Sequence, residues 1–162
     1  LMQSEIEARL AEAGYGHYET SAFAKKHREC QHNFNYWQFG DYLGIGAGAH
    51  SKLTAHDCVT RLMRHKQPKA YMEAALAGNA VQEQHQVETR ELPFEFMMNA
   101  LRLSEGFPAE LFSQRTGLPL ALLESKLATA TQRGLTQRQG EQVRPTPLGQ
   151  RFLNDLLQIF LP

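Results

Sequence analysis

The side chains best suited to chemistry lie in one short segment, HNFNYW, at positions 32 to 37. It places His32, Asn33, Tyr36 and Trp37 within six positions. Tyrosine and tryptophan offer flat apolar rings with one polar group each, and an imidazole can ligate a metal or haem iron. The cluster can therefore hold a planar macrocycle, with His32 or Tyr36 on the iron. A loop anchored by its own aromatic rings, with His32 bonded to backbone, explains the same residues, and composition alone favours it.

A zinc site is a second possibility, because Cys30, His32, His50 and Cys58 are ligands of a suitable type. Their spacing matches no established zinc motif, so we do not expect such a site. The two cysteines form no CxxC pair, and free thiols in a cytoplasmic protein are the expected state. A disulfide between Cys30 and Cys58 is the alternative.

A run of glycines follows the aromatic cluster. Gly44, Gly46 and Ala49 satisfy the dinucleotide fingerprint G-x-G-x-x-G/A. That fingerprint needs a helix whose N-terminus faces a pyrophosphate, and the sequence after Ala49 has no helical apolar period. We therefore reject a dinucleotide site. Such glycines otherwise permit turns with positive φ, or let the backbone approach a ligand or another strand closely.

Composition limits the class of protein. The 162 residues are 42% hydrophobic, which suits one domain or one domain plus a fragment of another. The 17 basic and 17 acidic residues balance, so nucleic acid is not favoured as the main partner. No apolar run approaches the roughly 20 residues of a membrane span, and the N-terminus does not resemble a signal peptide. Leu1 opens within a predicted helix, so we expect a C-terminal piece of a longer protein.

The elements that position these residues differ between the two halves of the chain. Capping-box spacing predicts a helix from Ser4 that Gly14 ends, and 15–20 is suited to a strand whose partners would lie upstream. Residues 21–66 are expected to be mostly irregular. A helix is predicted at 68–78, and a brief strand or linker at 85–91.

The second half predicts three helices, a small hairpin that turns at Gly140, and one closing helix. The helices begin near Pro93, Pro108 and Pro119, and the closing helix spans 147–161. This order is that of a winged-helix domain. The apolar positions expected to face the core are Phe94, Met97, Met98, Leu101, Leu120, Leu123, Leu127, Leu148, Phe152, Leu156 and Phe160.

A winged helix raises the possibility of DNA binding, in which the helix before the wing enters the major groove. The basic and amide side chains there are few, and nearby glutamates offset them, so a packing role is favoured. The residues concerned are Lys126, Gln132, Arg133, Arg138 and Arg144, with Glu124 and Glu141 as the offsetting acids.

Four motifs carry a resemblance to a known family: YETSAFAK at 18–25, HNxxYW at 32–37, DYLGIGAGAH at 41–50 and PFEFMMNALRL at 93–103. On these the chain resembles the oxygen-independent coproporphyrinogen III oxidase-like proteins of the radical SAM superfamily, across 14–161. Its closest branch is that of the bacterial haem chaperones (HemW), which HNxxYW marks. The oxidase branch, which decarboxylates coproporphyrinogen III, and a nucleic-acid-binding module are the alternatives.

The resemblance implies an α+β, mainly helical fold. Residues 1–66 would hold the last helix-strand unit of a partial (β/α)6 radical SAM barrel and the aromatic, glycine-rich segment. Residues 67–90 would be a helix and linker, and 91–162 a winged-helix-like C-terminal domain. The family binds a [4Fe–4S] cluster through CxxxCxxC and also S-adenosylmethionine. This chain lacks that motif, so neither cysteine is carried over as a ligand and the chain alone is not expected to perform radical chemistry.

The resemblance also implies a haem site. His32 would ligate the iron or orient the propionates, Tyr36 would be the second choice, Trp37 would wall the macrocycle, and Asn33 would fix the loop. The partners would be haem or porphyrin and haem-acceptor proteins, and not nucleic acid. The localisation would be cytoplasmic, while peripheral membrane association and the oligomeric state stay open. Backbone contacts near S-adenosylmethionine are expected at Gly44, Gly46 and Gly48.

Overall fold

The chain folds into short helices and strands, and the computed structural model describes residues 2–55 and 58–162. The helices are α1 (Met2–Glu12), α2 (Gln31–Trp37), α3 (Pro68–Leu76), α4 (Leu92–Ala100), α5 (Glu110–Thr116), α6 (Ala121–Gln132), α7 (Pro147–Arg151) and α8 (Leu153–Gln158). The strands are β1 (Tyr15–Glu19), β2 (Ala22–Lys25), β3 (His50–Ala55), β4 (Cys58–Arg64), β5 (Val81–Gln86), β6 (Phe107–Pro108), β7 (Thr136–Gln139) and β8 (Gln142–Pro145).

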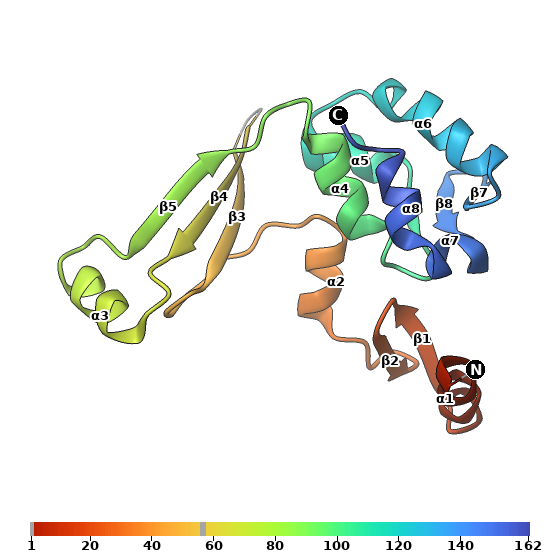
Figure 1. Ribbon diagram of the computed structural model, residues 1–162, viewed down its shortest axis with the longest axis horizontal. Helices are drawn as coiled ribbons and strands as arrows, with labels where there is room; N and C mark the ends of the chain where they lie inside the picture. Colours follow the sequence, from red (N-terminus) through yellow and green to blue (C-terminus); the bar gives the residue numbers. More distant parts are fainter. Residues whose placement is uncertain (1, 56–57) are drawn as a thin grey trace.

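The strands form three separate antiparallel sheets, in the orders β1-β2, β3-β4-β5 and β6-β8-β7. The elements from α4 to α8, with β6, β7 and β8 among them, form the helical domain. The β3-β4-β5 sheet projects away from this domain, and α3 lies beyond the far end of the sheet (Figure 1). Helix α2 lies between the β1-β2 hairpin and the helical domain (Figure 1). The sheet, the hairpin and the helical domain therefore surround the aromatic cluster of α2.

The first helix and strand occur as predicted, although α1 begins at Met2, before the predicted start at Ser4. Leu1 lies outside the described residues. Strand β1 has a partner within the chain, because it pairs with β2 through the register Tyr15↔Lys25. Whether β1 also belongs to a larger barrel stays a prediction.

The prediction that residues 21–66 are mostly irregular is wrong. This range contains β2, α2, β3 and β4. The two sheet strands were obscured because apolar and polar residues do not alternate strictly along them: Ser51 and Lys52 of β3 are both buried, and so is Val59 of β4, whereas Thr54 is exposed. Strand β5 was predicted incompletely because all its residues after Val81 are polar and exposed. It begins at Val81, four positions before the strand or linker predicted at 85–91.

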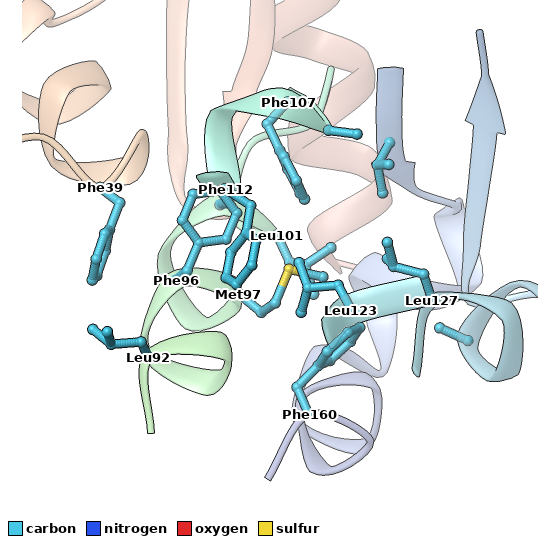
Figure 2. Packing of buried hydrophobic residues seen from close by; sticks show 14 of the residues in the cluster. Phe39, Leu92, Phe96, Met97, Leu101, Phe107, Phe112, Leu123, Leu127 and Phe160 are labelled. Atoms are coloured by element: carbon cyan, nitrogen blue, oxygen red, sulfur yellow. The ribbon is translucent and has the colours of Figure 1, made fainter. Parts of the chain in front are cut away.

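The C-terminal half follows the predicted order of three helices, a hairpin turning at Gly140 and a closing helical segment. Its core contains a cluster of rings in which Phe96 meets three others edge-on (Figure 2). The ring centroid of Phe96 lies 5.7 Å from that of Phe39, 5.2 Å from Phe107 and 5.4 Å from Phe112. Phe39 follows α2, so the core reaches from the helical domain to the segment that carries the aromatic cluster.

The buried side of α4 is rotated from the predicted stripe. Met97 and Leu101 are buried as expected, but Phe94 is half-buried and Met98 is 37% exposed. The helix packs on α2, α5 and α8 at once, so its core side is wide and centres on Phe96. Also buried on α4 are Leu92, Pro93, Asn99 and Ala100.

The closing helix is broken, which corrects the prediction of one continuous helix. Phe152 separates α7 from α8 with φ −112° and ψ 44°, and Leu148 and Phe152 are exposed, whereas Leu156 and Phe160 are fully buried. The cause lies at Gly149, where an added Cβ would lie 1.9 Å from the carbonyl oxygen of Leu135. Because α7 is held against that backbone, the chain must turn before α8 can pack on α4. Within the described ranges, no helix is long and apolar enough to cross a bilayer.

Candidate functional site

The HNFNYW segment forms helix α2 rather than a loop. Helical spacing places His32 and Tyr36 on one face, because residues four apart are neighbours on a helix surface. By the same spacing Asn33 and Trp37 share an adjacent face. The helix begins without a side-chain cap at Cys30, which removes the signal that would have predicted it. His32 and Tyr36 therefore lie on one face of α2, and Asn33 and Trp37 lie on the adjacent face.

The face that carries His32 and Tyr36 opens onto a hollow of about 550 Å³. This volume lies within the roughly 300–1,000 Å³ typical of small-molecule sites. Helix α2 forms one wall, and the other walls come from residues 43–49, called here the glycine loop, and from β3 and β4. The side chains that line it include His32, Tyr36, Tyr42, Leu43, Ile45, His50 and Arg61.

Trp37 lies away from this hollow and packs against the helical domain. Its ring meets Tyr36 edge-on at 4.7 Å, and the guanidinium carbon of Arg102 lies 4.4 Å from its centroid. Arg102 in turn pairs with the buried carboxylate of Glu19 on β1 at 2.6 Å. Trp37 therefore fixes α2 between the hairpin and the helical domain. Neither Trp37 nor Asn33 lines the hollow, and their contacts with a ligand stay predictions.

Gly44 is required by close packing. A Cβ there would lie 2.1 Å from the carbonyl oxygen of His50, so only glycine lets the loop lie against the start of β3. The amide N–H of Gly44 donates to Ser51 Oγ at 2.9 Å, and its carbonyl oxygen accepts from Arg64 Nε at 2.6 Å. The expectation of tight backbone packing thus describes this position.

Gly46 and Gly48 serve turns, with φ of 109° and 71°. The N–H of Gly46 donates to the Tyr71 hydroxyl at 3.2 Å, and that of Gly48 donates to the carbonyl oxygen of His65 at 2.8 Å. All three predicted glycine contacts therefore already use their N–H groups within the chain. Contact of these glycines with S-adenosylmethionine stays a prediction.

A buried lysine anchors the segment that leads into the glycine loop. Lys52, which is 2% exposed, donates from Nζ to Asp41 at 2.9 Å, to the Phe39 carbonyl at 3.0 Å and to Thr54 at 3.1 Å. Burial lowers the pKa of Lys52 despite the nearby carboxylate. Burial alone would raise the pKa of Asp41, but hydrogen bonds from Lys52 and Thr54 outweigh it and hold that pKa below its usual value. The backbone of Tyr42 pairs with that of Lys52. This pairing also holds Tyr42, which lines the hollow, in place.

Arg61 brings positive charge to the hollow. Its guanidinium pairs with Glu95 of α4 and donates from Nη1 to the Tyr42 hydroxyl at 3.4 Å. Burial would lower the pKa of Arg61, and the charge of Glu95 reverses this and raises it. Burial raises the pKa of Tyr42, so its phenol stays protonated at neutral pH. The Nε–H of Arg61 is buried and has no acceptor among the residues that the structure describes.

The structure also shows the surroundings of the residues considered for a zinc site and for DNA binding. Cys30 and Cys58 are free thiols, and in the described part of the chain no three His, Cys, Asp or Glu side chains gather in the arrangement of a metal site. Two of the cations suggested for DNA are bonded within the protein. Arg138 pairs with Glu124 at 3.2 Å, and Lys126 Nζ donates to the carbonyl oxygen of Leu161 at 2.7 Å.

Sequence reasoning missed several side chains of the hollow, among them Tyr42, Leu43, Ile45, Arg61 and, except as a zinc ligand, His50. Arg61 and His50 lie on β4 and β3, which were not predicted as strands. The adjacent β-branched residues Val59 and Thr60 in CVTRLMR were a signal that could have indicated β4.

Comparison with known proteins shows what this chain is similar to. Residues 87–152 match the HemN C-terminal domain. The chain is 42% identical over 153 residues, 94% of its length, to the heme chaperone HemW of Haemophilus influenzae, and equally to that of Escherichia coli. It is 36% identical over 161 residues, 99% of its length, to the heme chaperone HemW of Buchnera aphidicola from Acyrthosiphon pisum.

The matches cover only part of each relative. The chain spans 39% of the first two and 42% of the third. Among solved structures it resembles coproporphyrinogen III oxidase (HemN) from Escherichia coli, a radical SAM enzyme, with a TM-score of 0.65 and 19% identity over 98% of this chain and 39% of that one. The chain therefore corresponds to the C-terminal portion of a HemW/HemN-like protein.

Proposed function

We propose that the chain is the haem-binding part of a haem chaperone, and that the cargo haem binds in the hollow between α2 and the glycine loop. The observation that carries this proposal is that His32 and Tyr36, the two residues of HNxxYW on one helix face, line the same hollow. The relatives at 42% identity named heme chaperones support it, and they make the oxidase alternative less favoured. Haem-acceptor proteins would then receive the cargo.

His32 is the iron ligand in this proposal. Its side chain is exposed, and its imidazole makes no hydrogen bond within residues 2–55 and 58–162, so both ring nitrogens are free for a ligand. Leu43 and Ile45 of the glycine loop line the same hollow and are 70% and 84% exposed. A macrocycle lying against them would remove this apolar surface from water. The hollow thus provides both an iron ligand and an apolar wall.

The propionates of haem need a cation, and Arg61 supplies it. Its Nε–H lacks an acceptor in the described chain, and a buried donor left unsatisfied costs about 1–3 kcal/mol. A carboxylate that enters the hollow would accept this bond after a small shift of the guanidinium, which Glu95 keeps charged and oriented. The unpaired donor is the feature that fits an anionic cargo.

The [4Fe–4S] cluster does not fit the residues of this chain. The chain contains no CxxxCxxC motif, and its two thiols stand apart on α2's N-cap and β4. The cluster and the main contacts of S-adenosylmethionine would therefore belong to another part of the whole protein. The proposal for this chain is confined to haem.

A haem titration followed at the Soret band tests the proposal. The parent chain should show saturable binding with a ligated spectrum, and His32→Ala should lose that spectrum. His85→Ala is the matched control, because His85 is an exposed histidine on β5 outside the hollow, and it should bind as the parent does. Absence of saturable binding by the parent, or an unchanged spectrum in His32→Ala, would contradict the proposal.

A further inference from the structure

His50 lines the same hollow as His32 but comes from a different part of the fold. His32 lies in the first turn of α2, whereas His50 is the first residue of β3. Both side chains are exposed, and neither imidazole is hydrogen-bonded in the part of the chain that the structure describes. We infer that His50 supplies a second axial imidazole, so that haem is held six-coordinate between α2 and β3. This inference rests on the proposed haem-binding function.

The backbone of His50 is held firmly, which suits a metal ligand. Residue 50 pairs with Met63 in the β3-β4 ladder, and the N–H of Arg64 donates to the carbonyl oxygen of Ala49 at 2.9 Å. On the other side, Gly44 packs directly against the carbonyl group of His50. A ligand carried by a strand in this way is positioned more exactly than one carried by a mobile loop.

The wall that carries His32 is fixed independently. Trp37 on the neighbouring face of α2 is covered by Arg102, which is itself paired with Glu19. The two imidazoles are therefore presented by two separately anchored walls of one hollow. A planar macrocycle entering between these walls would meet one nitrogen donor from each.

Other side chains of the hollow are weaker candidates for the second ligand. The hydroxyl of Tyr42 is already engaged, because Arg61 Nη1 donates to it at 3.4 Å. Neither Cys30 nor Cys58 lines the hollow. Tyr36 lies four positions after His32 on the same face of α2. It therefore belongs to the same wall of the hollow as the first ligand, His32. His50 is the nitrogen donor that β3 offers to the same hollow.

The test compares the spin state of bound haem in variants of the full chain. Ferric haem on the parent should be low-spin by electron paramagnetic resonance and absorption. His50→Ala should bind haem roughly tenfold to hundredfold more weakly and should be high-spin. Added imidazole should restore the low-spin signal in His50→Ala, because it replaces the missing ligand, while His85→Ala should match the parent.

The outcomes separate this inference from the proposed function. If haem binds and His50→Ala keeps the parent's affinity and low-spin signal, or if the parent itself is high-spin, the His50 inference fails and the haem-binding function stands. If the parent binds no haem, both fail. Because the His50 side chain is exposed, its removal should leave the melting curve unchanged, which separates lost ligation from lost folding.

Discussion

Replacing Phe96 should destabilise the chain far more than replacing Phe152, although both changes remove the same atoms. Phe96 is 0% exposed and meets the rings of Phe39, Phe107 and Phe112 edge-on. Phe152 stands at the break between α7 and α8 and is 47% exposed. The pair isolates burial as the cause, since the sequence pattern alone assigns Phe152 to the core.

The expected magnitudes follow from the packing. Truncating a buried Phe to Ala costs about 3–5 kcal/mol, and each edge-to-face ring pair adds about 0.5–1.5 kcal/mol beyond burial. Three such pairs place Phe96→Ala near the upper end, at about 4–5 kcal/mol. Phe152→Ala removes roughly half a buried side chain, about 1 kcal/mol. Phe96→Leu keeps most of the volume and should cost about 1.5 kcal/mol.

Urea unfolding followed by circular dichroism measures these differences. With an unfolding slope of about 2 kcal/mol per molar urea, the midpoint should fall by about 2 M for Phe96→Ala and about 0.5 M for Phe152→Ala. Phe96→Leu gives a readable midpoint even if Phe96→Ala leaves much of the chain unfolded, because total stability is only about 5–15 kcal/mol. Equal midpoints for the Phe96→Ala and Phe152→Ala variants would refute the packing argument.

Two further predictions concern the segment around the hollow. Gly44→Ala should lower both the melting temperature and haem affinity, because its Cβ would lie 2.1 Å from the His50 carbonyl oxygen, whereas Gly16→Ala on β1, with only an ordinary contact at 3.8 Å, should change neither; equal effects would show that the close approach is unimportant. Because the pKa of Asp41 is lowered on folding, its bond to Lys52 stabilises the fold above the ordinary value of 3.8 and is lost as pH falls through the lower folded value. Urea midpoints should therefore fall with pH in that acidic window more steeply for the parent than for Asp41→Asn, and parallel curves would contradict the assigned role of the pair.

Much of the C-terminal half could be predicted because its signals are local. Proline at the start of α4, glycine at the end of α5 and the turn at Gly140 each fix the backbone within a few residues. The broken closing helix could not be predicted in this way. Its cause is the contact of Gly149 with Leu135, which only the folded structure brings together.

In the candidate site, too, only the features set by local sequence could be predicted. The periodicity of α2 is sufficient to place His32 and Tyr36 together, once the segment is known to be a helix. Helical spacing cannot show that Trp37 faces Arg102, 65 positions away in sequence. Nor can it bring His50 and Arg61 to the same hollow, because the β3-β4 pairing that does so depends on the register of two strands. The long-range half of the site therefore needs the structure.

Arg102 also determines how the chain can be divided for experiments. Its carbonyl oxygen accepts the N–H of Thr20 at 3.0 Å, its guanidinium pairs with Glu19, and the same group covers Trp37. A truncated version starting after the hairpin would leave this cation without its anion beside the indole, and would loosen α2 as well. The hairpin through Lys25 is thus part of the smallest unit worth expressing when haem is the ligand under study.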